Sequence, residues 1–65
     1  MFVAIEMYGK DEYIVYRMNA DGEEDMLKIY SIVEYARAYA EGLQQGTEAM
    51  YNVECPIYDD TRDGD

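Results

Sequence analysis

The stretch that decides the fold is Ser31–Gly46, SIVEYARAYAEGLQQG. Ser31, followed three residues later by Glu34, has the pattern of a capping box, in which the two side chains accept backbone N–H groups at the start of a helix. Gly46 is the residue type that most often ends a helix. Apolar residues recur between them at helical spacing: Ile32, Ala36, Tyr39, Ala40 and Leu43. We therefore expect one amphipathic helix over residues 31–46, with its apolar stripe facing the rest of the chain.

The rest of the chain has the composition of β-strands separated by turns. The expected strands are rich in β-branched and aromatic residues: Phe2–Tyr8, Glu12–Asn19, Met26–Tyr30 and Met50–Tyr58. Turns that contain Gly, Asn or Asp separate the first three, and Pro56 indicates an edge strand or the end of a strand. We expect an α+β fold of order βββαβ, in which one helix packs on one face of a three- to four-stranded antiparallel sheet and leaves the other face uncovered.

The second strand can face the helix in either of two ways, because side chains alternate along a strand. We favour an inward-facing set of Ile14, Tyr16 and Met18. The set expected to face outward is then Tyr13, Val15 and Arg17. In the first strand, we expect the core positions to be Val3, Ile5 and Met7.

The net charge restricts the function more than the length does. Among 65 residues, 15 are acidic and five are basic, so the formal net charge is −10. Because 49% of the residues are apolar and eight are tyrosine, a folded domain is favoured over disorder. We expect a single domain over residues 1–58 and a disordered acidic tail over residues 59–65. Direct binding to nucleic acid is disfavoured because this surface repels phosphates, so the partners should be basic proteins.

Residues able to carry chemistry are sparse. The chain has no histidine to activate Cys55 as a nucleophile, and we expect this cysteine to be a small buried hydrophobic residue. Asp21–Asp25 lacks the ligand spacing of a calcium loop because apolar residues follow it, and no phosphate-binding glycine loop is present. Acid–base catalysis would need a pocket that shifts the pKa of a carboxyl group. We expect a protein that is not an enzyme and that holds neither a cofactor nor a metal.

The expected location is a reducing, cytoplasmic compartment. A single cysteine excludes a framework of disulfides within the chain. Residues 1–3 have the pattern of the start of a strand and not of a signal peptide. No apolar run approaches the length that spans a membrane, so we expect no contact with a membrane.

The acidic surface is the candidate site for partner binding. Side chains on one face of a strand repeat at about 6.6 Å, so carboxylates on neighbouring strands and turns can form rows spaced comparably to the phosphates of a nucleic acid. Tyrosine is favoured in interface hot spots, and eight tyrosines exceed what one small core can bury. The candidate partner-binding residues are Glu6, Asp11, Glu12, Tyr13, Asp21, Glu23, Glu24, Asp25, Tyr30, Glu54, Tyr58, Asp59 and Asp60. The alternative is that the charge only keeps the domain soluble.

The run Glu34–Glu54, EYARAYAEGLQQGTEAMYNVE, follows two short tyrosine-rich hairpins. In size, charge and layout the chain resembles small acidic proteins encoded by bacteriophages and mobile elements. It is most similar to the compact anti-CRISPR proteins that block type I Cascade complexes, type I-C included, and less similar to the phage inhibitor of bacterial RNA polymerase. The resemblance implies a DNA mimic that occupies the target-DNA path inside the bacterial host cell. It implies no individual site residue.

These observations lead to hypotheses from different classes. The favoured one is a monomeric, stoichiometric inhibitor whose anionic face binds a basic nucleic-acid groove, with a Cascade-type subunit preferred to RNA polymerase or a restriction enzyme. The second is an acidic interaction module or a homodimeric assembly protein, joined through the uncovered sheet face. A third, a small hydrolase, would require a pocket with a perturbed carboxyl group.

Overall fold

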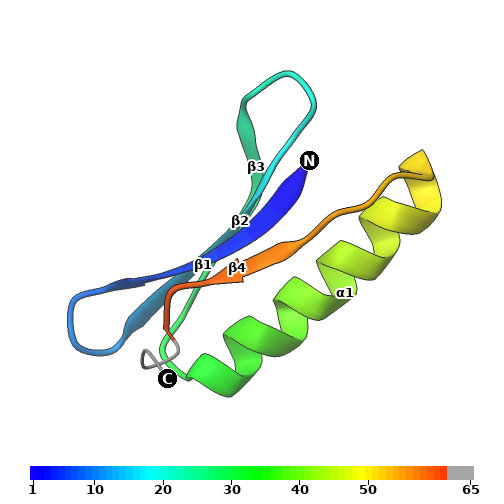
Figure 1. Ribbon diagram of the computed structural model, residues 1–65. Helices are drawn as coiled ribbons and strands as arrows, with labels where there is room; N and C mark the ends of the chain where they lie inside the picture. Colours follow the sequence, from blue (N-terminus) through cyan, green and yellow to red (C-terminus); the bar gives the residue numbers. More distant parts are fainter. Residues whose placement is uncertain (62–65) are drawn as a thin grey trace.

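One helix packs on one face of a four-stranded sheet in the computed structural model, which describes residues 1–61. The elements follow the expected order βββαβ: β1 (Phe2–Tyr8), β2 (Glu12–Met18), β3 (Glu24–Tyr30), α1 (Val33–Tyr51) and β4 (Ile57–Asp59). Figure 1 shows α1 on one side of the sheet and no other element of the described chain on the opposite side. The predicted α+β class with a single helix is confirmed.

The sheet is mixed, so the prediction of a fully antiparallel sheet is wrong. Its strand order is β3-β2-β1-β4. β2 pairs antiparallel with both β1 and β3, whereas β4 pairs parallel with β1, through Val3 opposite Ile57 and Ile5 opposite Asp59. The reason is the connection: α1 returns the chain to the end of the sheet at which β1 begins, and a helical crossover of this kind joins strands that run in the same direction.

Both predicted ends of the helix are displaced. The residue before the first turn is Ile32, in an extended conformation and without a side-chain cap, so the capping box of Ser31 and Glu34 does not form. The helix continues through Gly46, an interior position where glycine costs about 1 kcal/mol relative to alanine. It ends at Tyr51, followed by Asn52 in the left-handed conformation with φ of 55°. Asparagine is the other residue type that adopts this conformation at helix ends.

The predicted last strand, Met50–Tyr58, is wrong over most of its length, because its first two residues complete α1 and residues 52–56 form no strand. Only Ile57–Asp59 forms a strand, and β4 is an edge strand that begins directly after Pro56, as proline predicts. The predicted tail also starts too early, since Asp59 belongs to β4 and the N–H of Asp60 donates to the carbonyl of Ile5. Residues 62–65 of that tail lie outside the described residues.

The core lies between α1 and the sheet, and its residues reverse the predicted facing of β2. Val15 is fully buried, Tyr13 packs against the core, and Arg17 donates to Thr47 on α1. The strand register explains this, because Val15 lies opposite Ile5 and Arg17 lies opposite Val3. The buried hydrophobic cluster consists of Val3, Ile5, Val15, Ala36, Ala40, Leu43 and Cys55. The prediction that Met7 is a core position is wrong, because its side chain is 54% exposed near the β1–β2 turn.

Candidate interaction surface

The sheet face opposite α1, hereafter the open face, brings together acidic and apolar side chains. Twelve positions lie on this face according to the cross-strand pairing and the alternation of side chains along each strand. These are Phe2, Ala4, Glu6, Tyr8, Glu12, Ile14, Tyr16, Met18, Glu24, Leu27, Ile29 and Tyr58. Leu27 is 50% exposed, and Ile29 and Tyr58 are each 57% exposed. An uncovered face with this much accessible apolar surface is typical of an interaction site.

Three carboxylates are distributed across the open face, from the β1–β2 turn to the β2–β3 turn. Glu12 lies at the start of β2, Glu6 lies opposite Ile14, and Glu24 lies opposite Met18 at the far end of β2. Since β2 spans about 20 Å between Glu12 and Met18, the three acids are distributed over that length. The turns at the two ends add further exposed carboxylates, those of Asp11, Asp21 and Glu23. These six acids and Tyr58 are the predicted site residues that the open face and its ends bring together.

The centre of the open face is organised around a hydrogen bond. The hydroxyl of Tyr16 donates to Oε2 of Glu6 over 2.7 Å. This bond raises the pKa of Tyr16 to about 12, with smaller contributions from burial and from the negative charge of Glu6. Ala4 is only 5% exposed, because its cross-strand neighbours on this face are Tyr16 and Tyr58. The ring of Tyr58 in turn meets that of Phe2 edge-on, with centroids 5.2 Å apart.

We expect the substitution Glu6→Gln to lower the pKa of Tyr16 from about 12 toward its ordinary value of 10.0. The neutral amide oxygen of glutamine can still accept the hydrogen bond from the hydroxyl, but it lacks the negative charge of the carboxylate. In the parent chain the bond should stabilise the fold fully below pH 10, and this contribution should be lost as the pH rises toward 12. Tyrosine ring-carbon NMR titrations measure the pKa. The matched control is Glu12→Gln, which removes the same charge and should leave Tyr16 unchanged; equal shifts in both variants would contradict the assignment.

Asp25, one of the candidate partner-binding residues, lies on the helix side of the sheet and not on the open face. β3 has an irregularity in its pairing with β2 between Val15 and Arg17, and Met26 there has a positive φ of 55°. The register shift turns Asp25 toward α1. Its two carboxylate oxygens accept hydrogen bonds from Nε and Nη2 of Arg17, at distances of 2.8 and 2.7 Å. The arginine bonds hold the pKa of Asp25 below its usual range, so this carboxylate is already paired within the chain.

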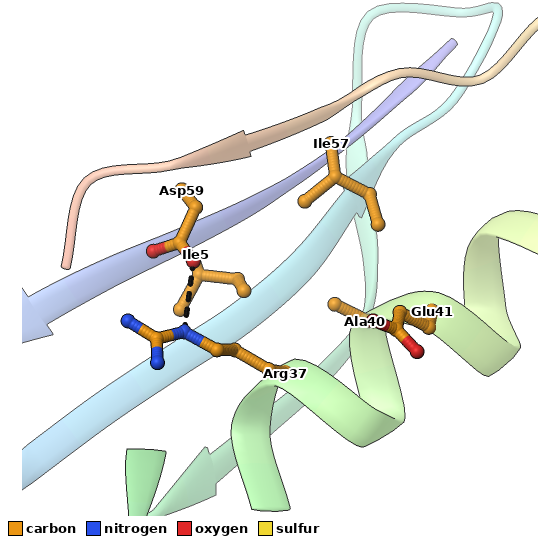
Figure 2. A pocket seen from close by; sticks show the side chains of 6 residues that line it. All are labelled: Ile5, Arg37, Ala40, Glu41, Ile57 and Asp59. Atoms are coloured by element: carbon orange, nitrogen blue, oxygen red, sulfur yellow. Dashed lines mark hydrogen bonds and ion pairs between the residues drawn. The ribbon is translucent and has the colours of Figure 1, made fainter. Parts of the chain in front are cut away.

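Asp59 is also paired within the chain and is not available as an acidic contact on the open face. Figure 2 shows Arg37 extending from α1 toward Asp59 on β4, and Nε of Arg37 lies 3.0 Å from Oδ2 of Asp59. Arg37 also donates to Oγ1 of Thr61. The hollow around this ion pair measures about 370 Å³ and is lined by Ile5, Arg37, Ala40, Glu41, Ile57 and Asp59. The ion pair fastens β4 to α1, which is a structural role.

The remaining predicted site residues are divided between the helix side and the end of the chain. Tyr13 and Tyr30 lie opposite each other on β2 and β3, face α1 and pack against the core, so they do not belong to the open face. The reversed facing of β2 accounts for this. Glu54 and Asp60 are exposed, the first in the connection from α1 to β4 and the second directly after β4.

A second exposed apolar surface lies between α1 and β3. It is a groove of about 510 Å³ lined by Arg17, Met26, Ala38, Tyr39, Gly42, Leu43, Gly46, Thr47 and Met50. Met26 and Met50 are 52% and 75% exposed. Gly42 packs against nothing within 4 Å of the position a Cβ would occupy, so no close approach of another backbone requires glycine there. Among the residues that the structure describes, no acid lines the groove, which distinguishes it from the open face.

Within residues 1–61, no group of three or more histidine, cysteine or acidic residues is placed to hold a metal ion. In the same part of the chain, no helix has both the length and the hydropathy needed to cross a membrane. Cys55 is fully buried, as predicted, and burial raises the pKa of its thiol. This thiol therefore lacks the thiolate character of a reactive cysteine.

Comparison with known proteins adds no family assignment. The chain matches no protein-family model, and neither curated proteins nor solved structures include a significant match to it. The function is therefore inferred from the open face itself.

Proposed function

We propose that this chain is a stoichiometric inhibitor that binds, through its open face, to a basic nucleic-acid groove on a target protein. The observation that carries the proposal is the row of Glu6, Glu12 and Glu24 across about 20 Å of an uncovered sheet face. The formal charge of −10 would draw the chain toward a surface lined with lysine and arginine from beyond contact distance. The mechanism is occupation of the groove, with no catalytic step and no cofactor.

The finer form of the proposal is an anti-CRISPR protein that acts in the bacterial cytoplasm. A type I Cascade complex holds its target DNA along a basic path, and an anionic face of this kind would compete for that path as a DNA mimic. Support comes from the resemblance in size, charge and layout to acidic inhibitors of Cascade. RNA polymerase and restriction enzymes also contain basic nucleic-acid grooves, and they are the alternative targets.

A homodimer joined through the open face is the second candidate function. The exposure of Leu27, Ile29 and Tyr58 favours it, because these side chains would be buried in such an interface. The carboxylates of Glu6, Glu12 and Glu24 oppose it, because like charges brought together in an interface are unfavourable. We therefore place the inhibitor first.

The proposal predicts capture of a nucleic-acid-binding complex that depends on salt. We expect the tagged chain to retain such a complex from bacterial lysate at about 0.1 M salt and to lose it at about 1 M, where the Debye length falls from about 10 Å to about 3 Å. Added duplex DNA should displace the chain at the lower salt concentration. The purified complex should lose its binding of target DNA when one equivalent of the chain is added. Capture that neither salt nor DNA affects would contradict the proposal.

A further inference from the structure

We infer that the element of the target that covers the open face is a basic amphipathic helix, which places a lysine or arginine against Glu6. This inference rests on the proposed function and names the part of the partner that the open face binds. Three features carry it: the partial burial of Glu6, the location of the chain's own basic residues, and the alternation of acidic and apolar positions along the sheet.

Glu6 requires a cation from any partner that covers the open face. Its side chain lies among Ala4, Ile14 and Tyr16 and is already partly buried. The Tyr16 hydroxyl is its side-chain hydrogen-bond donor within residues 1–61. An apolar surface laid over this position would bury an ionised carboxylate with a single hydroxyl donor, and burying an unpaired charge opposes binding strongly. A lysine or arginine at this point removes that penalty.

Within residues 1–61, a second copy of the chain has no basic residue on its own open face that could supply this cation. The four basic residues within residues 1–61 lie elsewhere. Arg17 and Arg37 are in ion pairs on the side of α1, and Lys10 lies in the β1–β2 turn. Lys28 lies opposite Val15 on the helix side, with its Nζ 6.0 Å from the ring centre of Tyr39. Two open faces placed together would therefore oppose carboxylates to carboxylates, so we assign the face to a different, basic protein.

The shape of the open face fits a helix. A helix is one of the elements that can cover the apolar face of a sheet, and α1 covers the other face of this sheet in this way (Figure 1). Ile14, Met18 and Ile29 provide an apolar strip between acids at both ends. The length of about 20 Å corresponds to about 13 residues of helix at 1.5 Å per residue. Lysines or arginines on both sides of an apolar stripe would meet the row of acids while the stripe covers the isoleucines.

Three synthetic peptides of equal length test the inference against the intact chain by NMR titration. The first is an amphipathic helix of leucine and lysine, the second has the same composition with the leucines dispersed, and the third replaces lysine with glutamate. We expect the amphipathic basic peptide to shift the amides of β1, β2 and β3 and to bind at least about tenfold more tightly than the dispersed one. The acidic peptide should not bind.

Two variants locate the contact, and a third serves as the control. Glu6→Gln and Ile29→Ser should each weaken binding of the amphipathic peptide about tenfold. Met50→Ser removes a 75% exposed apolar side chain from the groove between α1 and β3 and should leave the affinity unchanged. Ile29→Ser keeps the test informative if Glu6→Gln alters the fold of the sheet.

The outcomes separate this inference from the proposed function. Equal affinity for the two basic peptides, or full affinity of the Ile29→Ser variant, would overturn the inference that the partner element is an amphipathic helix. Neither result would contradict the proposed inhibition by charge. Dimerisation of the parent chain through the open face, observed by sedimentation, would overturn the inference as well. The displacement of the chain by duplex DNA tests the proposed function independently, because that experiment makes no use of the peptides.

Discussion

Replacing Val15 with aspartate will unfold the domain, whereas the same replacement at the neighbouring Ile14 will leave it folded. Val15 is fully buried between β1 and α1, and a carboxylate there has no cation within the hydrophobic cluster. Burial of an unpaired charge costs several kcal/mol, and a chain of this length has only roughly 3–10 kcal/mol of stability. Ile14 lies on the open face, where an aspartate side chain stays in contact with water. Far-UV circular dichroism and thermal melting distinguish the two results.

The control for this pair is Val15→Ala, which removes two methyl groups without adding charge. It should lower the melting temperature while the chain remains folded, because it leaves only a small cavity. If Ile14→Asp unfolds the chain and Val15→Asp melts like the parent, β2 faces the other way and the open face described above is wrong.

Reversing the charges of Glu12 and Glu24 together to lysine should weaken binding to the target complex about 100-fold. Each reversal replaces an attraction to a basic groove by a repulsion, and close charge pairs across interfaces contribute about 1.5 kcal/mol or more each, so two of them account for about two factors of ten. Both side chains are exposed, and the fold should tolerate the changes. Competition with target DNA, measured at fixed salt, provides the affinity.

A matched pair of reversals on α1 separates the open face from the net charge. Glu34 and Glu41 are exposed on the helix, and changing both to lysine alters the formal charge of the chain by the same amount. We expect only a few-fold loss of binding, from weaker long-range attraction. An equal loss for the two double variants would mean that no particular face binds, and unchanged binding in both would remove electrostatic inhibition as the mechanism.

The sequence predicts α1 and the two hairpins because their signals are local. The helix shows a 3.6-residue period, and Gly9 and Gly22, in the two hairpin turns, both take the positive φ that glycine allows. The facing of β2 is not local information, since both alternate sets contain apolar and aromatic residues. On the helix side Arg17 bonds Asp25 and Thr47, and those partners come from other elements.

The sequence shows that the candidate surface is acidic, but it does not show which residues belong to that surface. Asp25 and Asp59 look like their exposed neighbours, and only the register shift in β3 and the return of β4 beside β1 reveal that each is paired with an arginine. The apolar part of the open face depends instead on the facing of β2. The sequence places Ile14 in the core, which leaves no apolar strip between the acids.

The parallel pairing of β1 with β4 has a consequence for the order in which the domain can form during synthesis. The first strand leaves the ribosome early, yet its neighbour on one side is made only after β2, β3 and α1. Until then the β1–β2 hairpin has one edge of β1 unpaired. Pairing across nearly the whole chain is slow to form because a long loop must close first. The nascent chain therefore carries an open strand edge on β1 until β4 has been synthesised and has left the ribosome.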